Sequence, residues 1–441
     1  MKAKKQLFVS LDQSHHITAD YSLPDTYRDL LSLDPLRNYI AQGAGISYVP
    51  ASFGANIQTL GMRSFNRILS FSAEKQLVEL EAGISLGKLY TFLAAHGFYI
   101  SVQPGSPQIT VGGCISFNIF GKNQYREGLF SSVVEEVELY HPARGLLKLS
   151  ESSNAELFSL TCGGMGLTGI ILKAKLRLKK IPSAVVESQN IPVRHLHETF
   201  EQFHALKDSV DMLYSWNDLS SVKSLGQGFI IVGRFGKNGA ENVTEEIPGG
   251  SELHPEKIGY PFKYFNAATV GFFNRLYAFF NLRIKSKARL PLYQYIFPII
   301  RKTSYFDLYG KIGFRERQIL IPEPAVSDYL KEFESLIRQH RPVIPLCSCK
   351  LFSGDQKYLQ FNGTGFVLSI DTPAHRHQAF HEALTAINVH YKAIDNIAKD
   401  SGLSRADVQS EYTQFDLFRE KLLEYDPSRM FKSSLSEKLG L

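Results

Sequence analysis

The sequence predicts an α+β protein of two domains. With 441 residues, the chain is longer than a typical single domain. Hydrophobic residues make up 44% of it and charged residues 21%, which is the balance of a globular protein with a packed core. As far as Pro182, short alternating strands are separated by glycine-rich turns, and beyond it strand and helical patterns are mixed. We therefore expect an antiparallel sheet with covering helices after Pro182.

Periodicity assigns the main elements of the first domain. Residues 85–96 are expected to form a helix, because their apolar residues recur with helical spacing and Gly97 supplies a stop. Alternation with a period of two predicts strands at 77–82, 133–141 and 170–178. Pro182 follows shortly after the last of these strands and marks the edge of the domain.

The remainder of the chain has mixed patterns. Helical spacing recurs over 326–338. Cys347 and Cys349 alternate within an apolar run, which places both thiols on one buried face of a strand. From Asp400 onward the pattern is helical, and we expect these helices to pack back onto the first domain. The expected division is therefore 1–182, 183–395 and 396–441.

Composition excludes several classes of protein. Four cysteines without a CxxC pair are too few for a disulfide framework, and we expect no metal site. The basic N-terminus, residues 1–5, is not followed by the apolar run of a signal peptide. No run of about 18 uncharged apolar residues is present, which argues against a spanning helix. We expect a cytoplasmic protein, with membrane association left open by the segment described next.

One segment, residues 257–306, departs from this ordinary composition. It contains no Asp or Glu and is crowded with Phe and Tyr. Cations interleaved with aromatics suit a peripheral membrane contact or a lipid-phosphate ligand, although an inter-domain helix with a solvated basic flank would look the same. Nucleic acid is not expected as a partner, since no binding motif accompanies the charge. The basic residues are Lys257, Lys263, Arg275, Arg283, Lys285, Lys287, Arg289, Arg301 and Lys302.

Three glycine-rich loops are the most informative feature of the sequence, and they cover 43–48, 104–121 and 162–170. Glycine tolerates every backbone angle and adds no bulk, so the N–H groups of such loops can approach a diphosphate closely. Ser47 and Thr110 would add hydroxyl donors. Three such loops in one region predict a single extended ligand with a diphosphate, held along its length.

The third loop formally matches a dinucleotide-binding motif, because residues 164–169 read Gly-Met-Gly-Leu-Thr-Gly. A Rossmann site requires a strand before these glycines and a helix after them. Here a run with period-two alternation follows at 170–178, which predicts a strand. We therefore exclude a Rossmann nicotinamide site at this position.

The order of the three loops resembles the FAD-binding domain of the vanillyl-alcohol-oxidase / p-cresol-methylhydroxylase (PCMH) superfamily. Within it, the sequence is most similar to the flavin oxidase subunits of decaprenylphosphoryl-ribose 2′-epimerases. The similarity is strong up to Pro182, weak over 188–310, and returns from Gly313. It implies a two-domain FAD-binding PCMH-type fold with an antiparallel-sheet substrate (cap) domain. The matching segments are 104–105, 110–113, 121–123, 156–158, 166–171, 398–401 and 426–431.

The resemblance implies FAD as the cofactor and places the third loop against the flavin ring. Relatives in the superfamily often bind FAD covalently through a His near the second loop. The more similar flavin oxidase subunits carry a His in the Ile-x-Gly-Lys-Asn stretch without such a bond, and Phe120 stands there in this chain, while His96 and His141 fall on no matching position. We therefore expect non-covalent FAD with its ring face packed on Phe120. The residues expected to bind the cofactor are Gly43, Ala44, Gly45, Ile46, Ser47, Tyr48, Gly105, Thr110, Val111, Gly112, Gly113, Phe117, Asn118, Phe120, Gly121, Gly169, Ile170 and Asn396.

The same resemblance places four residues, three lysines and Gln318, at the isoalloxazine and the substrate, and it places Tyr48 in the lining of the pocket. Oxidising a secondary alcohol means removing a hydroxyl proton and delivering a hydride to the flavin. A lysine kept from water or set beside another cation has a lowered pKa and can accept that proton. Several lysines in one cleft also suit a phosphate-bearing sugar. The expected catalytic residues are Lys399, Lys122, Lys350, Gln318 and Tyr48.

Several positions depart from the pattern of the family. Asn396 stands where the family has a Tyr, Ser369 where it has a Cys at the isoalloxazine, and Val367 where it has an Asn. Residues 296–298 replace a tyrosine-rich stretch that lines the substrate tunnel. Trp216 matches a position that lines the pocket of the family, and a place in the core is the alternative for it and for Tyr48. These changes leave the flavin assignment intact and leave the substrate open.

The resemblance implies oxidation of a sugar hydroxyl to a ketone, in first place the 2′-hydroxyl of a polyprenyl-phosphate pentose as the first half of an epimerisation. A separate short-chain dehydrogenase would then reduce the ketone. Two alternatives stay open. The first is a soluble alditol or sugar-lactone oxidase acting on another polyol, and the second is a non-catalytic flavin-binding protein of the membrane surface.

Overall fold

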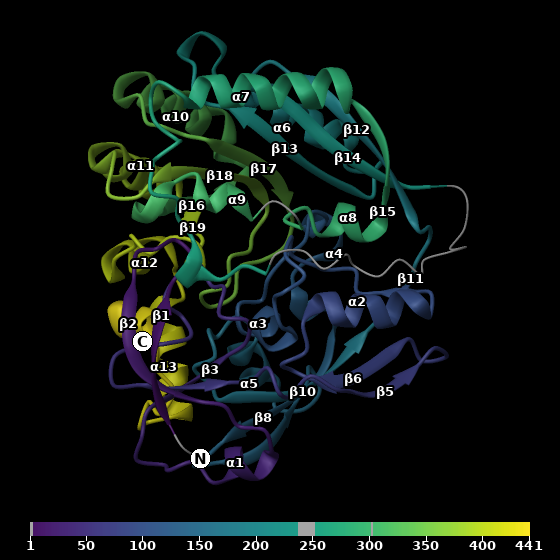
Figure 1. The fold of residues 1–441 in the computed structure, drawn as a ribbon, viewed down its shortest axis with the longest axis vertical. Helices are drawn as coiled ribbons and strands as arrows, with labels where there is room; N and C mark the ends of the chain where they lie inside the picture. The colour runs from purple at the N-terminus through teal and green to yellow at the C-terminus, as the bar shows by residue number, and fades with distance from the viewer. Residues whose placement is uncertain (1–2, 237–251, 301–302) are drawn as a thin grey trace.

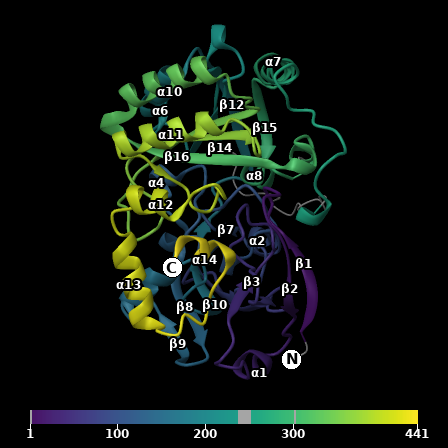
Figure 2. The same cartoon turned by 90° about the vertical axis from the view of Figure 1, so that its left-hand side faces the viewer.

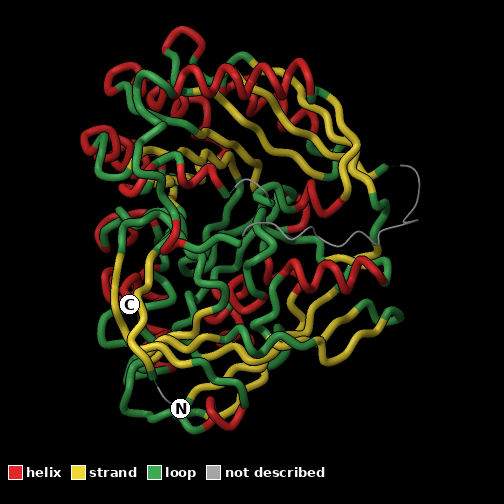
Figure 3. Tube along the Cα trace, viewed as in Figure 1, coloured by secondary structure: helices red, strands yellow, loops and turns green. Residues whose placement is uncertain are grey.

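The computed structural model describes residues 3–236, 252–300 and 303–441, and it combines helices with mainly antiparallel sheets (Figures 1 and 3). This is the α+β class that the sequence predicts. Met1, Lys2, Arg301 and Lys302 lie outside the described residues.

Two sheets dominate the N-terminal part. The first, in the order β1-β2-β4-β3, begins with an antiparallel hairpin that periodicity did not predict, and its other pairings are parallel. Its strands are β1 (Lys4–Val9), β2 (His16–Ser22), β3 (Tyr39–Gln42) and β4 (Gln58–Gly61). The second is antiparallel throughout, in the order β5-β6-β10-β8-β9. Its strands are β5 (Ile68–Ser72), β6 (Leu77–Glu81), β8 (Val134–His141), β9 (Gly145–Leu149) and β10 (Ile170–Arg177).

The elements expected from periodicity in this part are confirmed. Strands β6, β8 and β10 cover the three predicted runs, and helix α2 (Leu86–Ala95) covers the predicted helix. Ser85 caps α2 by accepting the N–H of Lys88. Gly97 follows the helix with a φ of 78°, the left-handed conformation that glycine adopts without strain.

Two antiparallel four-stranded sheets form the central part. Their orders are β13-β14-β12-β15 and β17-β18-β16-β19, and β13 lies alongside β17 where the two sheets meet (Figure 1). The first comprises β12 (Val185–Val193), β13 (Met212–Asp218), β14 (Gln227–Phe235) and β15 (Lys287–Pro291). The second comprises β16 (Phe314–Pro322), β17 (Leu346–Phe352), β18 (Gly365–Pro373) and β19 (Ile394–Asp395).

Helices α6 (Leu196–Leu206), α10 (Val326–His340) and α11 (Gln378–Tyr391) cover one face of these central sheets. The predicted helix at 326–338 is thereby confirmed. Because side chains alternate across a strand, β17 turns Cys347 and Cys349 toward this helical core and Ser348 and Lys350 to the opposite face. The opposite face of the central sheets lines the cavity described below.

The C-terminal segment returns to the N-terminal sheets. Helices α13 (Phe415–Tyr425) and α14 (Ser434–Leu439) lie beside the region of β8, β9 and β10 (Figure 2). Helix α12 (Arg405–Glu411) lies above them and contacts α11 and β19. Between α13 and α14 the backbone forms a ladder with β3, because Tyr39 donates to the carbonyl of Met430 and Lys432 donates to the carbonyl of Tyr39. The chain thus runs from the N-terminal sheets through the central sheets and back, and its C-terminal segment pairs with β3.

Shorter elements complete the fold. The small sheet pairs β7 (Phe98–Tyr99) with β11 (Lys179–Lys180). The remaining helices are α1 (Tyr27–Leu31), α3 (Val111–Ser116), α4 (Gln124–Glu127), α5 (Ala155–Thr161), α7 (Val270–Phe279), α8 (Leu292–Ile296) and α9 (Ser304–Asp307). Among the described helices, none combines the length and the apolar character needed to cross a bilayer.

Candidate active site

A cavity of about 760 Å³ lies between the N-terminal loops and the inner face of the central sheets. This volume is near the upper end for single small-molecule sites. One wall consists of the three glycine-rich loops, and the other carries side chains of β13, β16, β17 and β18. Tertiary folding therefore joins the two groups of residues that the sequence suggested separately.

Nearly all of the predicted site residues line this cavity. All five expected catalytic residues line it, as do the expected cofactor-binding residues other than Val111 and Ile170, and so does Trp216. Val111 donates its N–H to the carbonyl of Ile84, and its side chain is buried in the core beneath α3. Ile170 pairs with Tyr140 in the β8–β10 ladder and packs against Leu172. Their side chains therefore serve the core rather than the cavity wall.

The first loop presents a run of backbone donors. The N–H groups of Gly43 through Ser47 make no hydrogen bond within the described part of the chain. Gly43 has no room for a side chain, since a Cβ there would lie 2.1 Å from Oγ1 of Thr110. Gly45 has a φ of 71°, which turns the backbone sharply. Such a turn with consecutive free amides is suited to an anionic group.

The second loop is fixed by its own polar contacts. Thr110 caps α3 by accepting the N–H of Gly113 at 3.3 Å. Asn118 has a φ of 43°, and its Oδ1 accepts the N–H of Ser131 at 2.8 Å. Nδ2 of Asn118 is buried, borders the cavity and has no acceptor among the described residues. A ligand with an acceptor at this place would satisfy it.

The third loop is tied to the second. Gly163 donates to the carbonyl of Ile115, and Met165 donates to the carbonyl of Ser116. Helix α5 precedes the loop and strand β10 follows it, which is the reverse of the order in a Rossmann site. The exclusion of a Rossmann site from the sequence is thereby confirmed. Gly169 admits no side chain, because a Cβ would lie 2.6 Å from the carbonyl oxygen of Tyr140.

An ion pair stands on the opposite wall. Nζ of Lys399 lies 3.4 Å from each carboxylate oxygen of Glu316 and 3.4 Å from the ring centroid of Tyr48. Burial, with Glu316 and Asp371 nearby, raises the pKa of Tyr48 well above its ordinary value. The Tyr48 phenol therefore keeps its proton and acts as a hydrogen-bond donor and as a face for the Lys399 ammonium.

A buried acid, Asp371, lies in the same wall. Its Oδ2 accepts a hydrogen bond of 2.6 Å from Tyr305, whose hydroxyl also contacts that of Tyr309. Its Oδ1 is buried without a partner among the described residues, and the residue borders the cavity. Burial, reinforced by Glu316, raises the pKa of Asp371 well above its ordinary value. The neutral carboxyl that results can donate a hydrogen bond into the cavity.

Lys350 differs from Lys399 in its surroundings. Burial lowers the pKa of Lys350, and the positive charge of Lys399 lowers it further, while Glu316 opposes the shift. Nζ of Lys350 lies 5.8 Å from the ring centroid of Phe120 and has no hydrogen-bond acceptor among the described residues. It is the amine of the cavity that is best prepared to accept a proton.

An amide chain connects the strands beneath these charges. Nδ2 of Asn396 donates to Oε1 of Gln318 at 2.7 Å, and Nε2 of Gln318 donates to Oγ of Ser369 at 2.8 Å. Two residues that depart from the family pattern, Asn396 and Ser369, thus fix the orientation of Gln318. All three line the cavity.

Lys122 is held differently from the other two lysines. Its Nζ donates to the carbonyls of Tyr295 and Ile296 at 2.6 and 2.8 Å and lies over the rings of Tyr214 and Tyr295. These contacts tie the second loop to α8, so Lys122 joins the two walls of the cavity. Its expected catalytic role stays a prediction.

A buried charge cluster places the turn that carries Asn396 and Lys399. Arg315 binds Asp400 through two hydrogen bonds of 2.8 and 2.9 Å, and the fully buried Arg317 pairs with Asp395. These pairs anchor both ends of the 395–400 turn on β16. Glu316 and Asp371 were not predicted from the sequence, although their signal is present: each lies two positions from a predicted residue, Gln318 or Ser369, on the same strand face.

The FAD binding domain family matches residues 36–150, the region that supplies the first two loops. This chain is an FAD-dependent oxidoreductase. Over 426 residues it is 28% identical to the decaprenylphosphoryl-β-D-ribose oxidase of Mycolicibacterium smegmatis, which covers 92% of this chain and 90% of that protein. The L-gulonolactone oxidase of Bos taurus is 29% identical over 173 residues, 39% of this chain and 36% of that protein. The D-lactate dehydrogenase of Anaerostipes hadrus is 22% identical over 275 residues, 57% and 56% of the two chains.

The residues present fit FAD. The amides of 43–47 suit its diphosphate, and Nδ2 of Asn118 offers a donor to an acceptor of the cofactor, since these groups make no hydrogen bond to any residue that the structure describes. Phe120 packs against Phe352 and Phe361, with ring centroids 4.7 and 6.0 Å away, and presents an aromatic surface to the cavity. FAD, when bound, supplies a hydride acceptor. The chain itself supplies a proton acceptor, hydrogen-bond donors and a fixed cation around that position.

Proposed function

We propose that the protein oxidises a sugar hydroxyl to a ketone, with the 2′-hydroxyl of a polyprenyl-phosphate pentose as the first candidate. The single observation that carries the proposal is the cavity that unites the glycine loops with Lys350, Lys399 and Asp371. The relative from M. smegmatis, named as a decaprenylphosphoryl-β-D-ribose oxidase, supports a phosphorylated sugar because its similarity extends over both walls.

The three groups divide the chemistry between them. Lys350 accepts the hydroxyl proton, since burial lowers its pKa and its amine is free of acceptors in the described part of the chain. Lys399, paired with Glu316, keeps a positive charge beside the developing oxygen charge. Asp371 and Tyr48, both in their neutral forms, donate hydrogen bonds that orient the substrate.

The chain divides, in this proposal, into an FAD-binding region (1–182), a substrate cap (183–395) and C-terminal helices (396–441) that return to the first region. FAD is held without a covalent bond, because Phe120 stands in the stretch near the second loop and no histidine of this chain falls on a position that matches a linking His of the family. A short-chain dehydrogenase is the class of partner that would reduce the ketone and complete an epimerisation. Oxidation of a sugar lactone is the second candidate, supported by the similarity to L-gulonolactone oxidase.

Anaerobic reduction of the bound flavin tests the proposal. The purified yellow protein is mixed without oxygen with a polyprenyl-phosphate pentose, an alditol or a sugar lactone, and the absorbance of the flavin is followed. We expect bleaching by the phosphorylated pentose at the lowest concentration. Bleaching by the lactone alone would replace the first candidate with the second. Loss of the flavin from denatured protein, seen by mass, checks that the bond is non-covalent.

A Lys399→Ala variant tests the role of Lys399 in the proposed mechanism. We expect it to remain yellow and to lose reduction by substrate at least about a hundredfold, because the loss removes the fixed cation of the cavity. The Lys399→Ala variant leaves the Glu316 carboxylate without its cation, which could itself destabilise the fold. The double variant Lys399→Ala with Glu316→Gln removes that unpaired charge, so a loss of activity that persists in it comes from the missing cation and not from misfolding. Unchanged reduction in both variants would remove Lys399 from the site.

A further inference from the structure

One surface of the molecule is both apolar and basic, and it adjoins the cavity. Helix α7 and the π-helical turn that continues it (η4, Phe280–Ile284) form the outer edge of the central part (Figure 1). Exposed large side chains of this segment recur with helical spacing at positions 272, 276, 279, 280 and 284, and Tyr277, 40% exposed, stands at the border between this face and the cavity. Phe272 is 65% exposed, Phe279 is 56% exposed and Ile284 is 59% exposed. Their spacing places them on one stripe of the helix.

The other face of α7 is occupied. Val270 and Asn274 are buried, and Nδ2 of Asn274 donates to Asp218 at 2.8 Å. Phe273, Asn274 and Tyr277 line the cavity. The inner face of α7 therefore holds the helix against the protein, and the aromatic side chains of its outer face do not contribute to the core. An exposed apolar stripe of this kind marks a surface that meets a partner.

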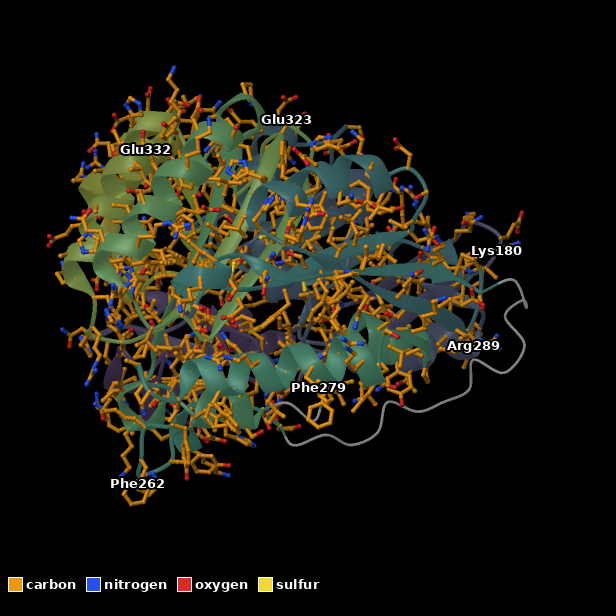
Figure 4. The ribbon with its side chains drawn as sticks, turned by 90° about the horizontal axis from the view of Figure 1, so that it is seen from above. Lys180, Phe262, Phe279, Arg289, Glu323 and Glu332 are labelled. Carbon is orange, nitrogen blue, oxygen red and sulfur yellow. The ribbon has the colours of Figure 1, made fainter. Side chains whose placement is uncertain are left out.

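The charges carried by the segment 257–289 itself have one sign. Seven cations between positions 257 and 289 are exposed, and none of them makes an ion pair within the described residues. Figure 4 shows Phe262, Phe279 and Arg289 along one edge of the molecule, while Glu323 and Glu332 lie at the opposite edge. Phe262 is 73% exposed. An apolar stripe bordered by unpaired cations complements a surface that has an apolar interior and anionic groups at its boundary.

We propose that the outer face of α7 and η4, with the exposed loop at Phe262, docks on an anionic lipid bilayer. The exposed aromatics enter the boundary between headgroups and acyl chains, and Arg275, Arg283 and Lys285 meet lipid phosphates. This contact is interfacial and does not span the membrane. It sets the cavity against the lipid layer, because the same helix lines the cavity with its inner face.

The inference deepens the proposed function and rests on it in one respect only, the lipid nature of the substrate. A substrate with a polyprenyl chain stays in the bilayer by its apolar tail. An enzyme docked through α7 would meet the phosphorylated sugar at the headgroup level without extracting the chain into water. The docking itself does not depend on which sugar is oxidised.

Vesicle sedimentation of the FAD-loaded protein tests the docking. We expect the protein to pellet with vesicles of phosphatidylcholine and phosphatidylglycerol and to stay in solution with phosphatidylcholine alone. Arg283→Gln with Lys285→Gln should weaken binding about twenty-fivefold, because each cation near an anionic surface contributes roughly fivefold. Phe272→Ser with Phe279→Ser should weaken it at least as much. High salt should release the protein from the anionic vesicles.

Matched controls come from the opposite end of the molecule. Leu36, which is 93% exposed after α1, is changed to Ser, and Lys4 with Lys5 on β1 is changed to Gln. These variants should bind vesicles as the unchanged protein does. Equal binding by the α7 variants, absence of any vesicle binding, or self-association of the protein that the α7 changes abolish would overturn the proposal. Flavin reduction by a soluble substrate, measured on the same samples, should not change, and this readout separates failed docking from failed oxidation.

Discussion

Lys350 and Lys399 show how neighbouring residues of one type acquire different roles. Lys399 faces Glu316 at 3.4 Å, whereas the amine of Lys350 lies 5.8 Å from the ring centroid of Phe120 and has no hydrogen-bond acceptor among the described residues. Burial and the charge of Lys399 lower the pKa of Lys350, and the lower pKa makes the neutral amine available nearer to neutral pH. The sequence contains both lysines, but their surroundings in the fold determine that Lys350, and not Lys399, is suited to accept a proton.

A prediction for Lys350 follows from the direction of this shift. The rate of anaerobic flavin reduction should rise with pH through the pKa of Lys350, which lies below the ordinary 10.5, because only the neutral amine accepts the proton. In Lys350→Met the rate should fall about a hundredfold and the rise should disappear. Lys357→Met, at an exposed lysine, is the control and should keep the profile. An unaltered profile in Lys350→Met would assign the base elsewhere.

At the scale of elements, the first glycine loop depends on its fit against α3. Gly43 and Thr110 belong to separate loops, and the hydroxyl that caps α3 occupies the place a Cβ at position 43 would need. The absence of a side chain at Gly43 therefore allows both the turn and the cap. Periodicity identified the loops as glycine-rich, but the contact between them belongs to the fold.

Gly43→Ala should therefore weaken FAD binding tenfold or more. The new Cβ would displace Thr110, uncapping α3 and moving the amides of the first loop, and tenfold corresponds to about 1.4 kcal/mol. Titration of the apoprotein with FAD, followed by flavin fluorescence, measures the change. Gly271→Ala is the matched control, since its Cβ would meet no atom closer than 3.6 Å. Equal affinity of the two variants for FAD would show that the first loop does not contribute to binding the cofactor.

At the scale of the whole molecule, the C-terminal helices and the central sheets are joined through a buried acidic contact. Oε2 of Glu411 on α12 accepts the backbone N–H of Asp395 at 2.7 Å, beside the Arg317–Asp395 pair. Burial, with Asp395 nearby, raises the pKa of Glu411 from 4.5 to about 9. The folded protein therefore favours the protonated form of Glu411 over a pH range in which the unfolded chain would release that proton.

The free energy of unfolding should fall as pH rises from about 4.5 toward about 9. The Glu411 contribution is fully present below the unfolded pKa and is lost as pH approaches the folded pKa, at up to about 1.4 kcal/mol per pH unit. In Glu411→Gln this component should vanish, so urea unfolding at pH 8 should show a more stable protein. Glu420→Gln, at an exposed position of α13, should behave as the unchanged chain does. The same pH slope in both variants would contradict the assignment.

The sequence by itself determined the local structure and the cofactor loops. The period of two at 77–82 and 170–178, the helical spacing at 85–96 and the glycines of the three loops are local signals, and residues near in sequence decide them. The strand after Gly169 was sufficient to exclude a Rossmann site. The family resemblance of these loops also indicated FAD as the cofactor. It further indicated that the lysines now seen on the opposite wall lie near the flavin ring.

The tertiary structure alone decided how these residues meet. The pairing of Glu316 with Lys399 depends on the register between β16, β17 and β18. On the same register depends the absence, within the described residues, of a hydrogen-bond partner for the amine of Lys350 and for Oδ1 of Asp371. Val111 and Ile170 share their loops with cavity residues, yet their side chains point into the core. The physical reason is that charge, burial and direction at each position are set by strands distant in sequence, whose alignment no local pattern encodes.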